Sequence, residues 1–347
     1  MRIAIVNDSL LATEALRRVV RSQPEHTVAW TALDAAQAIR LCSEDRPDVV
    51  LMDLVMPGMN GAEATRAIMQ RSPCPILVVT ATVAGNYSLV CEALGHGAYD
   101  AVCTPVLGDA PPAQAGAALL AKLTHVDRIQ RRIDARSISE VKAKAPQRPA
   151  IHARSAPPVV ALGASTGGPQ ALKTILANWP ATFPAAVLVA QHISADFADS
   201  LAEWLAQGSV LTVRAARNGD RPAAGTVLVA ATDDHLTMAA DGSLAYTPEP
   251  PDNPFRPSVD VLFHSLAEHW PRPGAAALLT GIGRDGALGL LALRRAGWHT
   301  IAQEGSTCVV DGMPQAARQV GAAVEVLPLA RIGESIARNL ERLRSAI

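Results

Sequence analysis

Short, almost purely apolar runs recur along the chain, and a segment with helical spacing separates each run from the next. The runs are rich in Val, Ile, Leu and Ala and do not alternate with polar residues, which is typical of strands buried in a parallel sheet. Apolar residues on one helical face, as between Ala12 and Val20, complete a repeated strand–helix pattern. The expected strands are 2–7, 28–32, 49–53, 76–80 and 101–103 in a first block, and 159–162, 186–190, 226–230, 277–280 and 300–302 in a second.

Two blocks of this kind predict an α/β protein with two doubly wound domains. At about 150 residues per domain, 347 residues also suggest roughly two. We expect a flavodoxin-like domain with a five-stranded parallel sheet over 1–121, and a second doubly wound α/β domain over 157–347. The segment 122–156 is rich in Arg and Lys and contains Pro146 and Pro149. It is therefore predicted to be a basic, proline-containing linker.

Charge and cysteine content exclude several classes of protein. Lys plus Arg is 31 and Asp plus Glu is 32, so there is no basic excess for non-specific nucleic-acid binding. No apolar run approaches the roughly 18 residues of a membrane span, and the first run stops at Asp8, too early for a signal peptide. The five cysteines form no C-x-x-C pair, which argues against a zinc site and a disulfide framework. We expect a cytoplasmic protein that neither inserts into a membrane nor binds nucleic acid.

Acidic residues follow two expected strands of the first block. Asp8 comes after the first strand and Asp53 ends the third. Because parallel strands share one carboxyl edge, both carboxylates should lie there and repel each other at pH 7. Carboxylate oxygens are ligands that suit Mg²⁺, which would remove this repulsion. Thr80, at the end of the fourth strand, adds a hydroxyl to the same edge.

The sequence around these residues resembles response-regulator receiver domains over residues 1 to about 120. The stretch Asp53-Leu54-Val55-Met56-Pro57, with Gly61 beyond it, is similar to the phosphoacceptor loop, and Thr80-Ala81 to the switch hydroxyl. The resemblance implies that Asp53 accepts a phosphoryl group from a CheA-type histidine kinase. It also implies a Mg²⁺ ion held by Asp8, Asp53 and the carbonyl of Val55, with Thr80 as the switch residue.

Three positions depart from the receiver pattern. Asn7 replaces the first of two acidic residues, Thr104 replaces a lysine before Pro105, and Ala101 replaces an aromatic switch residue. A lysine ammonium about 4 Å from the phosphoryl group would contribute up to about 4 kcal/mol before desolvation. We therefore expect phosphorylation of Asp53, with a weakened response.

In the second block, three residues of hydrolase type follow expected strands. The segment 163–167 fits G-x-S-x-G, in which flanking glycines permit a sharp turn that exposes the Ser165 hydroxyl. His192 ends the next strand and is a candidate general base. Asp285 follows a later strand and could orient the imidazole. The order Ser165, His192, Asp285 differs from that of α/β-hydrolases.

A competing interpretation comes from Gly281-x-Gly283-x-x-Gly286, which matches a dinucleotide-binding fingerprint. It follows a strand and precedes a helical pattern, and Glu304 lies about 20 residues further on. Against this, Asp285 would place a negative charge beside a pyrophosphate, and Ser165 and His192 would have no role.

Local sequence and domain order together resemble CheB, the family of chemotaxis response-regulator protein-glutamate methylesterases. The similar stretches are 163–172, 189–192, Arg256-Pro257-Ser258-Val259-Asp260, 278–286 and Asp311-Gly312-Met313-Pro314. The start of the chain and Thr104-Pro105 look most like members from Wsp-type surface-sensing systems.

The resemblance implies a role for each residue of the second block. Ser165 would be the nucleophile, His192 the general base and then acid, and Asp285 the orienting carboxylate. The backbone N–H of Ile282 would be an oxyanion donor, and Thr166 a close neighbour of the nucleophile. The substrate would be a glutamate 5-O-methyl ester, or a glutamine, of a methyl-accepting chemoreceptor, and no cofactor is implied for this domain. A receiver joined to a non-catalytic adaptor is the alternative.

Overall fold

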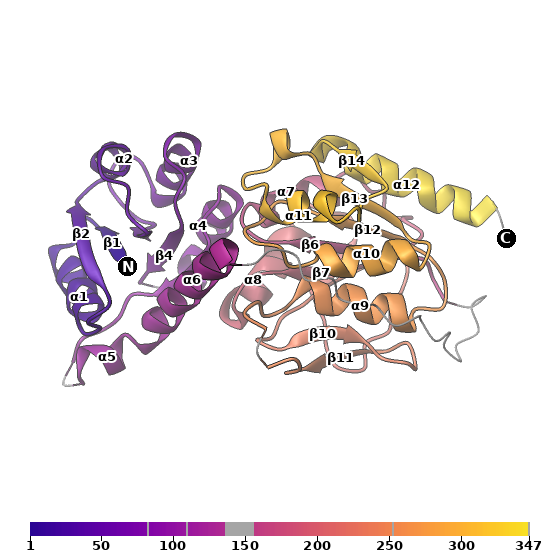
Figure 1. Cartoon of the computed structure of the whole chain (residues 1–347), viewed down its shortest axis with the longest axis horizontal. Helices are drawn as coiled ribbons and strands as arrows, with labels where there is room; N and C mark the ends of the chain where they lie inside the picture. The colour runs from indigo at the N-terminus through magenta and orange to yellow at the C-terminus, as the bar shows by residue number, and fades with distance from the viewer. Residues whose placement is uncertain (82, 109, 136–155, 252, 346–347) are drawn as a thin grey trace. The chain divides into compact units, whose positions relative to one another are not determined.

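The computed structural model describes residues 1–81, 83–108, 110–135, 156–251 and 253–345. The chain separates into two compact units, residues 1–136 and 137–347 (Figure 1). Each unit is a parallel sheet with helices on both faces, so the predicted α/β class is confirmed. No helix in the described ranges combines the length and the apolar character needed to cross a membrane.

The first unit is built on a five-stranded sheet in the order β2-β1-β3-β4-β5. All neighbouring strands are parallel. The strand order reverses between β1 and β3, so the carboxyl ends of these strands flank the crevice in which doubly wound sheets bind ligands. The strands are β1 (Arg2–Val6), β2 (Thr27–Ala32), β3 (Val49–Asp53), β4 (Ile76–Thr80) and β5 (Asp100–Cys103).

Helices cover both faces of this sheet. On one face, Leu16 of α1 and Leu123 of α6 belong to a core shared with the strands. On the other face, α2 contacts α3 and α3 contacts α4 (Figure 1). Ser9, Asp34 and Asn60 cap the first three helices by accepting a hydrogen bond from the backbone N–H three residues on. The helices are α1 (Leu10–Arg21), α2 (Ala35–Glu44), α3 (Gly61–Arg71), α4 (Val83–Gly95), α5 (Pro112–Ala115) and α6 (Ala117–Ala135).

The second unit contains a seven-stranded parallel sheet in the order β14-β13-β12-β6-β7-β9-β8. The chain starts at the central β6, builds outward through β7, and later crosses to the other side of β6 with β12. The switch point therefore lies beside β6. The sheet strands are β6 (Val159–Ala164), β7 (Ala186–Gln191), β8 (Thr212–Ala215), β9 (Thr226–Val229), β12 (Ala275–Leu278), β13 (His299–Gln303) and β14 (Glu325–Leu327), and a separate antiparallel pair is β10 (His235–Met238) with β11 (Leu244–Thr247).

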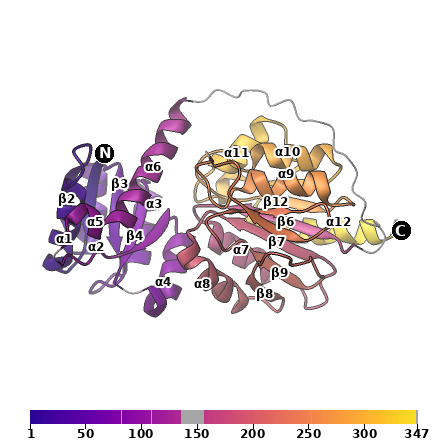
Figure 2. The ribbon, with the colours of Figure 1, turned by 90° about the horizontal axis from the view of Figure 1, so that it is seen from below.

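Two layers of helices enclose the second sheet. Figure 2 shows α9, α10 and α11 on one face, and α7 and α8 on the other. The C-terminal helix α12 contacts β12 and β13, and its Ile332, Ile336 and Leu340 are fully buried. The helices are α7 (Gly168–Leu176), α8 (Ala195–Ala206), α9 (Val259–His269), α10 (Ala287–Arg295), α11 (Gly312–Gln319) and α12 (Leu329–Ser345), with a 3₁₀ turn η1 (Gly305–Thr307).

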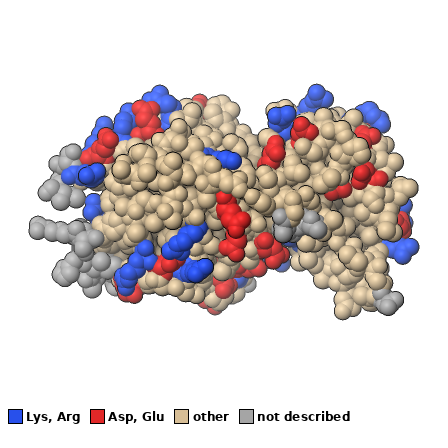
Figure 3. Space-filling model, turned by 180° about the vertical axis from the view of Figure 1, so that it is seen from behind, with Lys and Arg blue, Asp and Glu red and all other residues tan. Residues whose placement is uncertain are grey.

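Some elements lie outside the predicted pattern. The edge strands β8 and β14 and the pair β10–β11 were not predicted from the sequence. The segment predicted as a linker, 122–156, begins within α6, and its part at 136–155 lies outside the described residues. On the face shown in Figure 3, basic and acidic side chains both occur among a majority of uncharged residues.

Candidate active site and phosphoacceptor site

Ser165, His192 and Asp285 follow three neighbouring strands of the second sheet. Ser165 comes directly after β6 and His192 directly after β7, and the backbone N–H of His192 donates to the carbonyl of Ala164 over 3.0 Å. Asp285 lies in the loop between β12 and α10. Because β6 lies between β7 and β12, the structure brings the three residues together at the switch point.

A tight turn between β6 and α7 carries Ser165, whose side chain is buried and not exposed as the motif predicts. The N–H of Ser165 donates to the carbonyl of Thr280 over 3.0 Å, and the N–H of Gly168 donates back to the carbonyl of Ser165 over 2.7 Å. Gly167 has a φ of +81°, which disfavours any residue with a side chain, and a Cβ there would lie 2.6 Å from Val309. The turn that G-x-S-x-G predicts is therefore formed, and its second glycine is required on two grounds.

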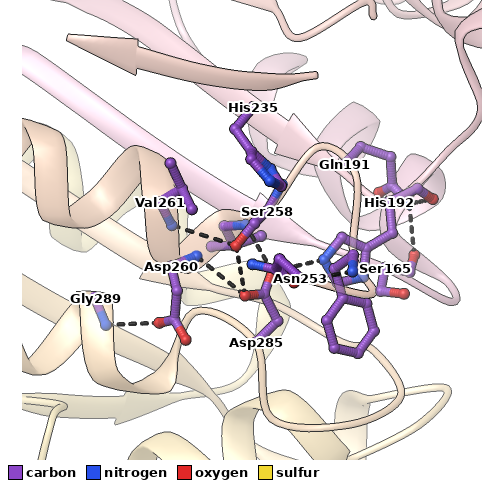
Figure 4. A network of polar contacts seen from close by, with 12 residues as sticks. Ser165, Gln191, His192, His235, Asn253, Ser258, Asp260, Val261, Asp285 and Gly289 are labelled. Atoms are coloured by element: carbon purple, nitrogen blue, oxygen red, sulfur yellow. Dashed lines mark hydrogen bonds and ion pairs between the residues drawn. The ribbon is translucent and has the colours of Figure 1, made fainter. Parts of the chain in front are cut away.

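A hydrogen bond joins His192 to Asp285. The His192 Nε2 and the Asp285 Oδ2 are 2.8 Å apart, and both side chains are buried (Figure 4). Since an ionised carboxylate can only accept, Nε2 carries the proton. Nδ1 of His192 is buried and has no hydrogen-bond partner among the described residues. Its lone pair is therefore available to take a proton from a neighbouring hydroxyl.

The ring of Phe255 stacks on the imidazole of His192, with centroids 4.5 Å apart and planes 14° from parallel. This contact restricts rotation of the imidazole about its side-chain bonds. A Cβ at Gly283 would lie 3.1 Å from the far end of the Phe255 ring, so Phe255 fills the space between His192 and the loop after β12. The aromatic ring thus packs between the imidazole and this loop.

The start of α9 surrounds the carboxylate of Asp285. The backbone N–H of Val259 donates to Oδ2 over 2.6 Å, and the Ser258 hydroxyl donates to Oδ1 over 2.8 Å. Burial alone would raise the pKa of Asp285, but the hydrogen bonds from His192, Ser258 and Val259 hold it below its ordinary value. Asp285 is therefore an ionised carboxylate at a helix N-terminus, where negative charge is favoured.

A second carboxyl group, that of the half-buried Asp260, lies in the first turn of α9. Its Oδ1 accepts a 2.6 Å hydrogen bond from the backbone N–H of Gly289 in α10. Burial, together with the negative charge of Asp285, raises the pKa of Asp260 to about 8. At neutral pH the pair therefore carries one negative charge, and it resides on Asp285.

Two backbone N–H groups beside Ser165 are free to bind an oxyanion. Among the described residues, neither the N–H of Thr166 nor that of Ile282 has a hydrogen-bond acceptor. A Cβ at Gly281 would lie 2.6 Å from the Cβ of Ser165, so the loop that carries Ile282 runs directly beside the serine. The Thr166 hydroxyl is buried and unpartnered within the same described ranges. These two N–H groups are candidate oxyanion donors beside the candidate nucleophile.

In the first unit, Asp53 and Thr80 lie at the carboxyl ends of β3 and β4. The N–H of Val55 donates to Asp53 over 3.4 Å, and the amide of Asn86 donates to the Thr80 hydroxyl over 3.3 Å. Burial raises the pKa of Asp53, the N–H groups of Val55 and Leu54 oppose this rise, and the charge of Asp8 adds to it. The carboxylates of Asp8 and Asp53 thus repel each other beside the loop that carries the carbonyl of Val55. Oxygen ligands of this kind suit a hard cation.

Comparison with known proteins assigns a family to each unit. Residues 160–336 match the CheB methylesterase family, and residues 3–109 match the response regulator receiver domain. The chain belongs to the CheB methylesterase family. It is 51% identical over 344 residues to protein-glutamate methylesterase/protein-glutamine glutaminase 4 of Burkholderia thailandensis, and 48% identical over 343 residues to a protein of that name, number 1, from Bordetella avium. The first match covers 99% of both chains, and the second covers 99% of this chain and 97% of its relative.

A solved CheB structure agrees with the fold of the second unit. The CheB methylesterase catalytic domain of Thermotoga maritima matches with a TM-score of 0.50 and 37% identity, over 52% of this chain and 97% of that chain. No dinucleotide fingerprint is needed to explain Gly281, Gly283 and Gly286 in this CheB domain. They shape the loop beside Ser165, and the Asp285 carboxylate that the loop carries is bound by His192.

The three departures of this CheB receiver have structural consequences. The Asn7 side chain accepts a 2.8 Å hydrogen bond from the N–H of Ser9, so its oxygen serves the turn into α1. Thr104 donates its backbone N–H to the carbonyl of Thr80 over 2.9 Å, and Ala101 is buried. The ion pair between Lys122 and Asp100 lies at the start of β5. Asp53 lies at the end of β3, so the two are at opposite edges of the parallel sheet. None of these residues takes the place of the missing lysine.

Sequence reasoning assigned no role to Gln191, Phe255, Ser258 or Asp260. Gln191 is buried, and its Nε2 donates to the carbonyls of both Ser165, over 2.9 Å, and His192, over 3.0 Å. It therefore ties together the backbones of two site residues. The one available signal for Gln191 was its place at the end of an apolar strand. Phe255, Ser258 and Asp260 lie in the stretch 255–260, which is remote in sequence from β6 and β7.

The pair formed by Asp260 and Asp285 predicts an unusual pH dependence of stability. Because the pKa of Asp260 is raised from near 4 to about 8, the folded state holds this proton more tightly than the unfolded state between those values. Its contribution to stability therefore falls as pH rises, by up to about 1.4 kcal/mol per pH unit. In Asp260→Asn, which imitates the protonated acid, this fall is absent. Urea unfolding of both proteins at pH 5, 6 and 7 tests it, and parallel curves would contradict it.

Proposed function

We propose that this chain is a phosphorylation-regulated protein-glutamate methylesterase and protein-glutamine glutaminase that acts on methyl-accepting chemoreceptors. The observation that carries the proposal is the 2.8 Å bond between His192 and Asp285, which leaves Nδ1 of His192 unpartnered among the described residues, beside the strand end that bears Ser165. The names of the Burkholderia and Bordetella relatives supply the substrate class.

The reaction begins at Ser165. Its Oγ attacks the ester carbonyl carbon, and its proton passes to Nδ1 of His192. The tetrahedral intermediate collapses when the bond to the methoxy group breaks, and His192 returns the proton so that methanol leaves. Water then attacks the acyl-enzyme, gives a proton to His192, and the glutamate carboxylate is released as Ser165 regains its proton. With a glutamine substrate, ammonia leaves in place of methanol.

Charge develops at two places during this reaction. The carbonyl oxygen becomes negative, and the N–H groups of Thr166 and Ile282 would stabilise it. The imidazole of His192 becomes positive, and the ionised carboxylate of Asp285 would stabilise it through Nε2. Because a backbone group supplies the second oxyanion donor, an isoleucine at position 282 is compatible with this role. No metal ion takes part in these steps.

In the receiver, Asp53 would accept a phosphoryl group from a CheA-type histidine kinase. Asp8, Asp53 and the carbonyl of Val55 would hold Mg²⁺, which neutralises charge on the phosphoryl group when it is bound. Phosphorylation adds negative charge near Thr80, whose hydroxyl is the candidate switch. We place the receiver at 1–135, because α6 continues it beyond residue 121 with Leu123 in its core, and the catalytic domain at 157–347. We place the site of action in the cytoplasm, in a Wsp-type pathway.

Phosphorylation of Asp53 is tested separately from catalysis. We expect acetyl phosphate with Mg²⁺ to retard the wild-type chain on a Phos-tag gel, because the acceptor and one further metal carboxylate are present. Asp53→Ala should show no shift, whereas Asp48→Ala, a carboxylate at the other end of β3, should shift like the wild type. A retarded band in Asp53→Ala would mean that another residue is the acceptor.

A fluorophosphonate probe distinguishes the hydrolase from a non-catalytic adaptor. Such probes phosphonylate a serine only when a base activates it. We expect covalent labelling of the wild type and none of Ser165→Ala. Unlabelled wild-type protein would favour the adaptor, and equal labelling of both would show that a different serine is activated.

A further inference from the structure

Four donors hold the carboxylate of Asp285, and three of them come from consecutive residues at the start of α9. Besides His192, they are the Ser258 hydroxyl at 2.8 Å, the N–H of Val259 at 2.6 Å and the N–H of Asp260 at 3.3 Å. The orientation of Asp285, and through it that of His192, therefore depends on where residues 258–260 lie. Figure 4 shows this network.

Ser258 differs from an ordinary helix cap. Its Oγ accepts a 3.3 Å hydrogen bond from the N–H of Val261, which is the usual role of a cap. A cap needs only this accepted bond, and its own proton commonly points to water. Ser258 is fully buried, and its proton is donated to Oδ1 of Asp285 instead. One hydroxyl thus fixes both the helix and the carboxylate.

His235, on β10, holds Ser258 from the other side. Its Nδ1 accepts a 3.1 Å hydrogen bond from the N–H of Ser258, and its Nε2 lies 3.4 Å from the carbonyl of Pro250. An accepting Nδ1 requires the proton to be on Nε2, so the ring is neutral. The side chain is fully buried, and burial lowers the pKa of His235. The hairpin β10–β11 therefore contributes a fixed acceptor to this network.

We propose that Ser258 and His235 are positioning residues for the hydrolase, acting on His192 through Asp285. The proposal rests on the proposed function. Ser258 restricts Oδ1 so that Oδ2 faces His192, and His235 restricts the backbone of Ser258. Neither side chain reaches the substrate, so their loss should lower kcat and leave KM unchanged.

Ser258 also affects the charge of Asp285. A hydrogen bond to a carboxylate favours its ionised form, so removing this donor raises the pKa of Asp285. Because Asp285 is hydrogen-bonded to the general base His192, the acidic limb of the activity profile belongs to this pair and should move to higher pH. A helix cap without a catalytic connection would not move that limb. The other titratable or charged groups around Asp285 are His192, His235, Asp260, His264 and Arg284. The two serine variants below change none of these groups, and the two variants at position 235 change only His235.

Ser258→Ala, compared with Ser265→Ala, tests the first half of the proposal. Ser265 lies in the same helix and bonds to the N–H of Met238 and the carbonyl of Leu262, without contacting Asp285. In methanol release from a methylated chemoreceptor by the full chain, Ser258→Ala should lower kcat by about 10- to 100-fold and shift the acidic limb upward by about one pH unit. Ser265→Ala should change neither.

Two substitutions at His235 test the second half. His235→Asn can place its Oδ1 near the position of Nδ1 and keep an acceptor for Ser258, whereas His235→Leu removes it. We expect Asn to retain most of kcat and Leu to lose about as much as Ser258→Ala. If His235→Asn and His235→Leu lose kcat equally, the role of His235 is purely structural and the proposal is overturned. The same follows for Ser258 if Ser258→Ala and Ser265→Ala lose kcat equally and the acidic limb does not shift.

The rate at which a fluorophosphonate labels Ser165 gives a second readout that needs no receptor. If the wild type is labelled but releases no methanol from the receptor, the substrate assignment fails while the positioning proposal is still decided by the labelling rates. Ser258→Ala should then be labelled about 10- to 100-fold more slowly than Ser265→Ala. Equal rates would contradict it.

Discussion

Ser165→Ala is expected to lower kcat for methyl-ester hydrolysis by about 10⁴- to 10⁶-fold, the range found when a serine hydrolase loses its nucleophile. The oxygen that forms the acyl-enzyme is gone, and His192 has no proton to accept at Nδ1, which has no partner among the residues that the structure describes. The turn at 163–167 is stabilised by backbone hydrogen bonds and by Gly167, so the substitution should leave the fold intact. Methanol release under single-turnover conditions measures the loss.

Phosphorylation of Asp53 serves as the control for Ser165→Ala. The receiver is a separate compact unit, so a folded variant should be phosphorylated to the wild-type extent. A variant that is phosphorylated and still hydrolyses the ester near the wild-type rate would rule out Ser165 as the nucleophile.

Asp285→Asn is expected to lower kcat by about 10⁴-fold, as in other triads in which the orienting carboxylate becomes an amide. The amide nitrogen cannot accept the Nε2 proton of His192. If it donates to Nε2 instead, the imidazole proton moves to Nδ1, which can then no longer take the proton of Ser165. Loss of the negative charge also leaves the imidazolium unsupported.

Asp260→Asn is the matched control for Asp285→Asn, because the two aspartates are neighbours in one hydrogen-bonded network. Asp260 is already protonated at neutral pH, so an amide there changes no charge. We expect its kcat at pH 7 to stay within a few-fold of the wild-type value. Comparable losses in both variants would mean that the negative charge does not reside on Asp285.

The sequence predicted the framework of both sheets because strands buried on two faces are almost purely apolar. Val159 to Leu162 is such a run, and it lies fully buried at the centre of the second sheet. The edge strand β14 has only three residues and its Val326 is 46% exposed, so no apolar run marks it. The pair β10–β11 was missed for a related reason, since Thr237 and Tyr246 interrupt its apolar pattern.

The candidate triad could be predicted because parallel strands end at one edge, which places residues distant in sequence together. Ser165, His192 and Asp285 each follow such a strand. The groups that orient them could not be predicted in this way. Ser258 and His235 reach Asp285 through the position of α9 and a hairpin, and that position is set by packing of the whole domain.

Methanol release from a methylated chemoreceptor, by the wild type and Ser165→Ala, with and without a phosphodonor, tests the central claim most directly. We predict release that depends on Ser165 and that the phosphodonor increases by about 5- to 150-fold, the range of typical allosteric couplings. The departures at Asn7, Ala101 and Thr104 place our expectation toward the lower end of that range. Release that continues unchanged in Ser165→Ala, with or without the phosphodonor, would contradict the account.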